Sequence, residues 1–114
     1  MTIREISSLI KGEILCGEVH LDQLQCYGVA SDLMSDVLTI RDDNFLLITG
    51  LANIQSIRTA EMSDVKCVLL VRGKEATKEM IELAEENGMV LMRTPFSMFK
   101  TSGILFAAGL NPFY

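Results

Sequence analysis

The sequence has few of the residues that most enzymes use for catalysis. Its only histidine is His20, and no serine or cysteine lies in a recognisable nucleophile motif such as G-x-S-x-G. The five glutamates at positions 75–86 share one expected helix and are most simply its solvated face. We therefore expect no enzymatic activity, no catalytic residues and no cofactor.

Cysteine is also scarce. Cys16, Cys26 and Cys67 are an odd number in a chain long enough to build a full core, which is typical of reduced thiols. Cys16, His20 and Cys26 have the spacing C-x3-H-x5-C, without the paired C-x-x-C of structural zinc sites. The simpler interpretation is that Cys16 and Cys67 point into the core from strands, as free cysteines often do. The sequence predicts no metal site.

Excess positive charge and long apolar runs are missing too. The formal net charge is −5 and the Lys and Arg residues are scattered, whereas nucleic-acid binders carry a basic stripe. The longest apolar stretch, near residues 103–110, is far too short for a membrane span. Residues 1–13 contain Glu5 and Glu13 instead of the uninterrupted apolar core of a secretory signal. We expect a cytoplasmic protein that binds neither nucleic acid nor membrane.

The apolar residues that are present indicate an α/β fold. Continuous apolar runs are typical of strands covered on both faces. Three such runs lie at 45–49, 66–71 and 89–93. Helix-length segments at 53–63 and 75–87 separate them, and short links of this kind imply right-handed parallel crossovers. The prediction for residues 1–114 is one domain, a three-layer α/β/α sandwich with a mostly parallel sheet of about five strands.

Cap and stop signals predict the remaining elements. Residues 2–10 begin with the T-x-x-E pattern of a reciprocal helix cap, and brief strands are expected at 13–17 and 27–31. A helix over 32–40 is expected to start from Asp32 as its N-cap. Its inward residues would be Leu33, Val37 and Ile40. The last helix is expected from Ser97 to Ala108, with Gly109 ending it.

Candidate ligand-binding residues follow the carboxyl ends of the three apolar strands. In an open parallel sheet, ligands collect beyond these ends, where helix N-termini expose free amides. Arg72 and Lys74 would add positive charge there. The candidate ligand-binding residues are Thr49, Gly50, Asn53, Arg72, Gly73 and Thr94.

The glycine pattern of this edge argues against a phosphate loop. The segment ITGLANIQS has a single glycine, Gly50, whereas a dinucleotide loop needs G-x-G-x-x-G and a P-loop needs G-x-x-x-x-G-K-[S/T]. The side chains of Leu51 and Ala52 would also obstruct close approach of a phosphate. We favour the interpretation that Gly50 lets the chain turn and Asn53 caps a helix. A small-anion or nucleotide-sensing site remains the alternative.

The C-terminal segment GILFAAGLNPFY has large apolar side chains close to a chain end, where fraying is expected unless something covers them. Either these side chains pack back on their own sheet, or they join a second subunit. Symmetric pairs are common among soluble proteins, so we predict a homodimer, with another protein as a further kind of partner. The candidate interface residues are Phe106, Leu110, Phe113 and Tyr114.

Four segments carry a resemblance to a known family: GEILCGE, LLITG, VKCVLLVRG and IELAEENGMVLMRTPFSMFKT. With them, nearly the whole chain resembles a DRTGG domain. That family is similar to the N-terminal domain of HPr kinase/phosphorylase. Its members accompany phosphate acetyltransferases and CBS-domain pyrophosphatases, and also occur as free-standing small proteins. The resemblance implies an α/β/α sandwich that serves as a regulatory or assembly module, without established catalysis of its own.

The signature residues of that family are mostly replaced here. Where the family has Gly-Asp-Arg, this chain has Leu-Ala-Asn at 51–53, and Thr-Gly-Gly becomes Val-Arg-Gly at 71–73. The family's Asp-Thr before the last helix becomes Ser-Met at 97–98. Only Gly73 of the five naming residues is present, and Arg72 replaces the lost charge in part. We therefore predict a non-catalytic regulatory or protein-interaction module, with small-anion or nucleotide sensing as the alternative.

Overall fold

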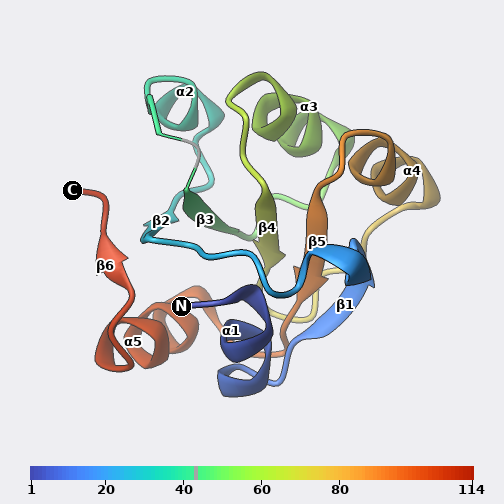
Figure 1. The fold of residues 1–114 in the computed structure, drawn as a ribbon. Coiled ribbons are helices and arrows are strands. Elements are labelled where there is room, and N and C mark those ends of the chain that lie inside the picture. Colours follow the sequence, from blue (N-terminus) through green and yellow to red (C-terminus); the bar gives the residue numbers. More distant parts are fainter. Residues whose placement is uncertain (43) are drawn as a thin grey trace.

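The computed structural model describes residues 1–42 and 44–114. Within these residues the middle layer is a six-stranded sheet in the order β1-β5-β4-β3-β2-β6 (Figure 1). The strands are β1 (Glu13–Cys16), β2 (Tyr27–Ala30), β3 (Phe45–Thr49), β4 (Cys67–Leu70), β5 (Val90–Arg93) and β6 (Asn111–Pro112). Neighbours from β6 to β5 pair in parallel, and β1 pairs antiparallel with β5. The two-residue strand β6 raises the number above the predicted five.

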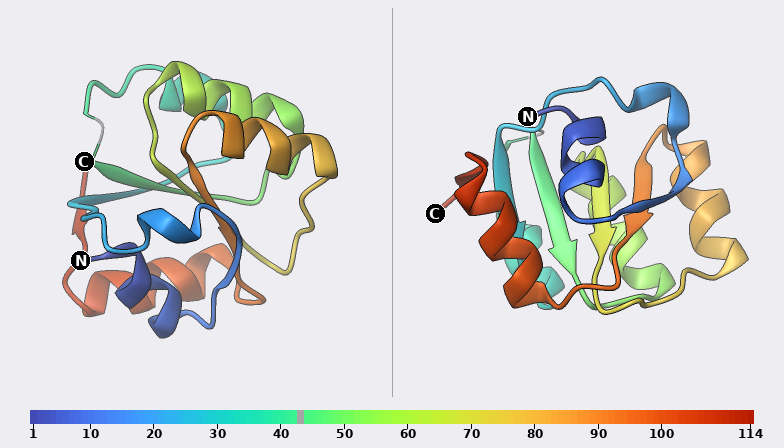
Figure 2. Two further views of the ribbon diagram at one scale, coloured as in Figure 1. Left: turned by 45° about the vertical axis from the view of Figure 1, so that its right-hand side comes forward. Right: turned by 90° about the horizontal axis from the view of Figure 1, so that it is seen from below.

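Helices cover both faces of this sheet. They are α1 (Ile3–Leu9), α2 (Met34–Val37), α3 (Ile54–Met62), α4 (Lys78–Glu86) and α5 (Met98–Ala107), with a short 3-10 helix, η1, at Glu18–His20. Figures 1 and 2 show α2, α3 and α4 on one face and α1 and α5 on the other. The predicted three-layer α/β/α sandwich is thus confirmed. Across the described part of the chain, none of the helices is long and apolar enough to cross a membrane.

The central strands supply the core on both faces of the sheet. Successive side chains of a strand point to opposite faces. Phe45 and Leu47 of β3 therefore join the core beneath α2, α3 and α4, whereas Leu46 and Ile48 join the core beneath α1 and α5. All five residues of β3 are buried, which is why its sequence reads as a continuous apolar run.

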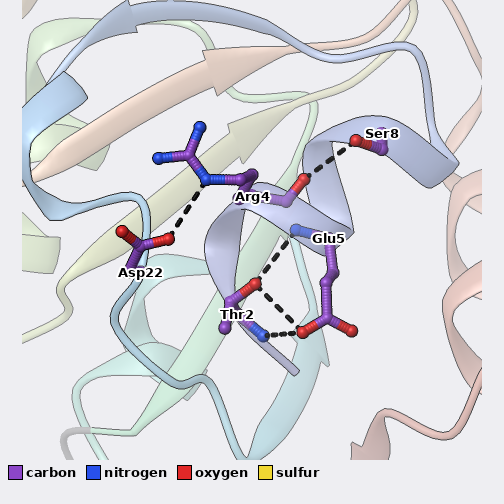
Figure 3. Close-up of polar contacts among 5 residues, drawn as sticks. All are labelled: Thr2, Arg4, Glu5, Ser8 and Asp22. Carbon is purple, nitrogen blue, oxygen red and sulfur yellow. Dashed lines mark hydrogen bonds and ion pairs between the residues drawn. The ribbon is translucent and has the colours of Figure 1, made fainter.

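Helix α1 begins with the reciprocal cap that its sequence predicts. The Oγ1 atom of Thr2 accepts from the backbone N–H of Glu5 at 3.1 Å, and the Glu5 carboxylate accepts from the backbone N–H of Thr2 at 3.3 Å (Figure 3). The Arg4 guanidinium also contacts Asp22 at 3.1 Å. Because both of these charged side chains are exposed, their pair contributes little to stability. The cap, rather than the ion pair, defines the start of this helix.

Helix α2 is shorter than predicted and does not begin from Asp32. Leu33 occupies the N-cap position although its side chain cannot accept a hydrogen bond, and it is 59% exposed rather than inward-facing. Val37 and Ile40 are buried, as predicted. Asp32 fails to cap the helix because its carboxylate accepts hydrogen bonds from the loop after β3 instead.

Candidate functional site

The carboxyl ends of β3, β4 and β5 meet at one edge of the sheet. Thr49 pairs with Leu70, and Leu70 pairs in turn with Arg93, so the three strands end level with one another. The prediction that their three loops share an edge is confirmed. What the edge can bind depends on how many of its hydrogen-bond donors are free to reach a ligand.

In the first loop, the carboxylate of Asp32 already accepts hydrogen bonds from Thr49 and Gly50. Its Oδ1 atom accepts from the Thr49 hydroxyl at 2.8 Å and from the backbone N–H of Gly50 at 2.6 Å. The Thr49 hydroxyl oxygen accepts in turn from the Leu51 N–H at 3.1 Å. Asn53 caps α3 by accepting from the Ser56 N–H at 3.0 Å. The amides of Gly50 and Leu51 are therefore already paired, and the Asp32 carboxylate repels an incoming anion.

Sequence reasoning missed this role of Asp32. The residue follows β2 by two positions, and β2 pairs in parallel with β3, so Asp32 lies at the same edge. An acid just beyond a parallel neighbour is a signal that could have identified it. The local sequence around Asp32 predicts a helix N-cap instead. Its contact with Gly50 spans 18 residues, and a local pattern cannot reveal it.

Replacing Asp32 with alanine is expected to lower the free energy of unfolding by about 1.5 kcal/mol, since hydrogen bonds to a charged acceptor are lost from a partly exposed site. Urea denaturation followed by circular dichroism measures this. Asp36→Ala, on exposed α2, is the matched control and should change stability by less than about 0.5 kcal/mol. Equal losses in the two variants would show that the Asp32 contacts are not stabilising.

The second loop is a tight turn whose amides also point into the protein. Arg72 and Gly73 both have positive φ angles, 59° and 66°, and the N–H of Lys74 donates to the carbonyl of Val71 at 3.3 Å. These features are typical of a type I′ turn. The N–H of Arg72 donates to the Phe96 carbonyl at 2.7 Å, which ties this turn to the third loop.

The side chains of Arg72 and Lys74 place two cations on the second loop. Both residues are exposed, and no carboxylate in the described ranges pairs with either. Arg93, by contrast, contacts Glu13 at 2.8 Å and Glu75 at 3.7 Å. Hydrogen bonding to Glu13 raises the pKa of Arg93, which therefore stays charged and paired. Arg72 and Lys74 are therefore better placed than Arg93 to contact an anion.

In the third loop, Thr94 is fully buried and serves the fold. Its hydroxyl donates to the carbonyl of Ile10 at 2.6 Å and accepts from the N–H of Phe96 at 3.2 Å. The N–H of Gly73 donates to the Thr94 carbonyl at 2.8 Å. Thr94 thus joins the end of α1 to the second and third loops. It does not line an open surface.

Cys16 and Cys67 are buried thiols of the core. Burial raises the pKa of the Cys16 thiol, and burial, with a smaller contribution from Cys16, strongly raises that of Cys67. Both thiols therefore stay protonated at neutral pH and point into the core, as predicted. Within residues 1–42 and 44–114, no cluster of His, Cys, Asp and Glu could hold a metal ion.

The candidate interface residues separate into two pairs. Leu110 is 5% exposed and belongs to the core beneath α1 and α5. Phe113 packs edge-on against Tyr27, with ring centroids 5.7 Å apart, and contacts Phe45 as well. Phe106 and Tyr114, however, are 67% and 83% exposed. The tail packs on its own sheet through two of the four residues and leaves the other two at the surface.

Comparisons with known proteins agree with this architecture. A family model described as the DRTGG domain matches residues 5–108. Among solved structures, the chain is similar to the CBS and DRTGG domains of the regulatory region of Clostridium perfringens pyrophosphatase, complexed with the activator diadenosine tetraphosphate. The TM-score is 0.74 at 17% sequence identity, over 91% of this chain and 45% of that one. This chain thus spans less than half of that structure. No curated protein sequence matches it significantly.

Proposed function

Because this chain belongs to the DRTGG domain family, we propose that it is a non-catalytic regulatory module that acts by binding protein chains, first of all a second copy of itself. The similar structure from Clostridium perfringens is part of the regulatory region of an enzyme. A module of this kind needs a recognition surface, not a catalytic site. A cytoplasmic homodimer would suit that role.

The observation that carries the proposal is the exposure of two phenylalanines on α5. Phe99 is 89% exposed and Phe106 is 67% exposed. Both lie on a different face of α5 from its buried residues, Thr101 and Leu105. Burying a phenylalanine side chain contributes about 1.5–3 kcal/mol. A partner that covers both rings therefore gains much of the binding free energy that a weak complex requires. Exposed apolar surface on one element is typical of protein-interaction sites.

We predict that the protein self-associates as its concentration rises from micromolar to millimolar. Sedimentation equilibrium measures this directly, since the apparent mass should increase toward twice that of the chain. Deletion of residues 110–114 is a poor variant, because it would also remove Leu110 from the core. A chain that stays monomeric throughout the concentration range would overturn the homodimer.

A second candidate function is nucleotide sensing at the turn that carries Arg72 and Lys74. Two observations favour it: these cations are exposed, and the similar Clostridium perfringens structure is complexed with diadenosine tetraphosphate. Against it, the Gly50 amide is taken by Asp32, and the amides of Arg72 and Gly73 donate to Phe96 and Thr94. Such a ligand would have to do without these three amides.

We expect diadenosine tetraphosphate, ATP and inorganic phosphate to leave the melting temperature unchanged. A ligand at a hundred times its dissociation constant would add about 2.7 kcal/mol to the stability, which is easily detected by thermal shift. Arg72→Gly is the informative variant. It removes the cation, and because glycine tolerates the φ of 59°, it should itself melt higher. A nucleotide shift that disappears in Arg72→Gly would establish nucleotide sensing.

A further inference from the structure

We propose that α5 is the contact surface for a second copy of this chain, and that the two α5 helices pair in antiparallel orientation. This inference rests on the self-association proposed above and adds its geometry. The contact stripe on each helix consists of Phe99, Ser102, Gly103 and Phe106. Figure 2 shows α5 on the outside of the molecule, next to the C-terminal strand.

The stripe is a continuous face of the helix. Its residues have the spacing i, i+3, i+4 and i+7, which places them on one side of an α-helix. The two rings stand at its ends, and the small residues Ser102 and Gly103 lie between them. A small centre flanked by two rings leaves room for a second helix to pack closely.

A groove runs along the stripe. It has a volume of about 340 Å³ and opens between α5 and the β2–β6 edge of the sheet. The far wall and floor are small or apolar, because Gly28 and Ala30 of β2 leave space beside Leu110 and Pro112. An aromatic ring from a partner helix can therefore enter beside each stripe.

The order of residues in the stripe makes it complementary to itself. In an antiparallel pair centred between positions 102 and 103, Phe99 lies opposite Phe106 of the second copy. Ser102 then lies opposite Gly103 of that copy, and each relation occurs twice about the two-fold axis. Symmetric dimers require a surface that matches its own copy in this way. A parallel pair would instead bring Phe99 against Phe99 and Phe106 against Phe106 of the second copy, which gives the two orientations different cross-linking patterns.

The glycine in the middle of α5 supports a close contact. Glycine inside an exposed helix costs about 1 kcal/mol relative to alanine, so it needs a packing or functional reason. Inside this chain there is none, because no described atom lies within 4 Å of a Cβ built at Gly103. A second helix that approaches closely over Gly103 supplies the reason.

Charge also favours this face for contact between two copies. The chain has a formal net charge of −5, so most pairs of surfaces repel each other. Helix α5 contains one charged residue, Lys100, whose ammonium group lies 3.9 Å from the centre of the Phe96 ring. The exposed face of α4, by contrast, contains four glutamates. Two acidic copies therefore repel each other less at α5 than at α4.

The variant Gly103→Ala tests whether Gly103 serves the contact between two copies or only the stability of its own helix. Alanine should raise the melting temperature of the dilute monomer, because it favours the helix and meets no atom of its own chain. It should also weaken the dimer at least about tenfold, because an added methyl group overpacks a close helix contact. Phe106→Ser should weaken it further, whereas Met62→Ser, at an exposed apolar position on α3, should not. A dimer unaffected by Gly103→Ala and Phe106→Ser would overturn the proposal.

Disulfide trapping tests the orientation. In a Cys26→Ser background, which removes the exposed thiol, Phe99→Cys chains mixed with Phe106→Cys chains should form a covalent heterodimer under mild oxidation. Neither variant should cross-link with itself. Self-linking of Phe99→Cys would establish a parallel pair and overturn the antiparallel one. If sedimentation shows a dimer but no cross-link forms, α5 is not the interface, and the proposed homodimer stands. A strict monomer overturns both.

Discussion

Replacing Thr94 with valine is expected to lower the free energy of unfolding by about 3 kcal/mol, because two buried backbone groups lose their partner. The hydroxyl donates to the Ile10 carbonyl at 2.6 Å and accepts from the Phe96 N–H at 3.2 Å, and the side chain is fully buried. Valine keeps the shape of threonine without either hydrogen bond. Urea denaturation of the purified variant gives the difference directly.

Thr94→Ser is the matched control for this experiment. Serine retains the hydroxyl and removes one methyl group, so it should cost about 1 kcal/mol. If the serine variant were as unstable as the valine variant, packing rather than hydrogen bonding would explain the loss. Because Thr94 joins α1 to the loop edge, Thr94→Val should also increase amide hydrogen exchange at the end of α1 before it does so in the central strands.

Gly17→Ala is expected to be the most damaging small substitution in this chain, with a loss of about 4 kcal/mol in the free energy of unfolding. Two costs add. The φ of Gly17 is 89°, which disfavours residues with a Cβ, and a Cβ there would lie 2.8 Å from the Cα of Val90. That neighbour is backbone of β5 and cannot turn aside as a flexible side chain could.

Gly73→Ala separates these two costs. Its φ of 66° is also positive, but none of the described atoms lies within 4 Å of the added Cβ. The expected loss is therefore only about 1 kcal/mol, from conformation alone. Thermal unfolding of the two variants side by side measures the contribution of the contact with β5. Similar melting temperatures would mean that β1 and η1 can move away from β5 at little cost.

The central sheet could be predicted from the sequence because its strands are buried on both faces. A continuous apolar run such as FLLIT indicates a strand that is buried on both faces. The short connections between such strands allow few arrangements of the strands in the sheet. The strand β6 was missed because two residues, one of them proline, have no periodicity to detect. Its existence depends on Leu110 fixing the chain beside β2, a contact that becomes visible only in three dimensions.

The sequence predicts where the candidate edge lies, but not which of its hydrogen-bond donors are free. Sequence reasoning placed three loops together, yet the availability of their amides depends on partners far along the chain. Asp32 reaches Gly50 across 18 residues, and Thr94 reaches Ile10 across 84. Local patterns cannot report such contacts. They identified Asp32 as a helix cap because the competing acceptor role involves a neighbouring strand.

The turn at Arg72 gives a physical reason for the glycines in the family signature. The resemblance places Gly-Gly at positions 72 and 73, and both positions have positive φ here. Glycine adopts such angles without strain, whereas arginine does so at a cost of about 1 kcal/mol. This chain therefore keeps the turn while carrying a cation where the family has a residue without a side chain. The strain at Arg72 thus accompanies the gain of a cation on this turn.

The carboxylate on the Gly50 amide has a consequence for how the protein could be controlled. A ligand changes the behaviour of a protein only by binding one of its states more tightly than another. Here the chain supplies the negative charge from its own residue Asp32. An anion that bound at the Gly50 amide would have to displace Asp32, so its binding would compete with the contacts that hold this loop.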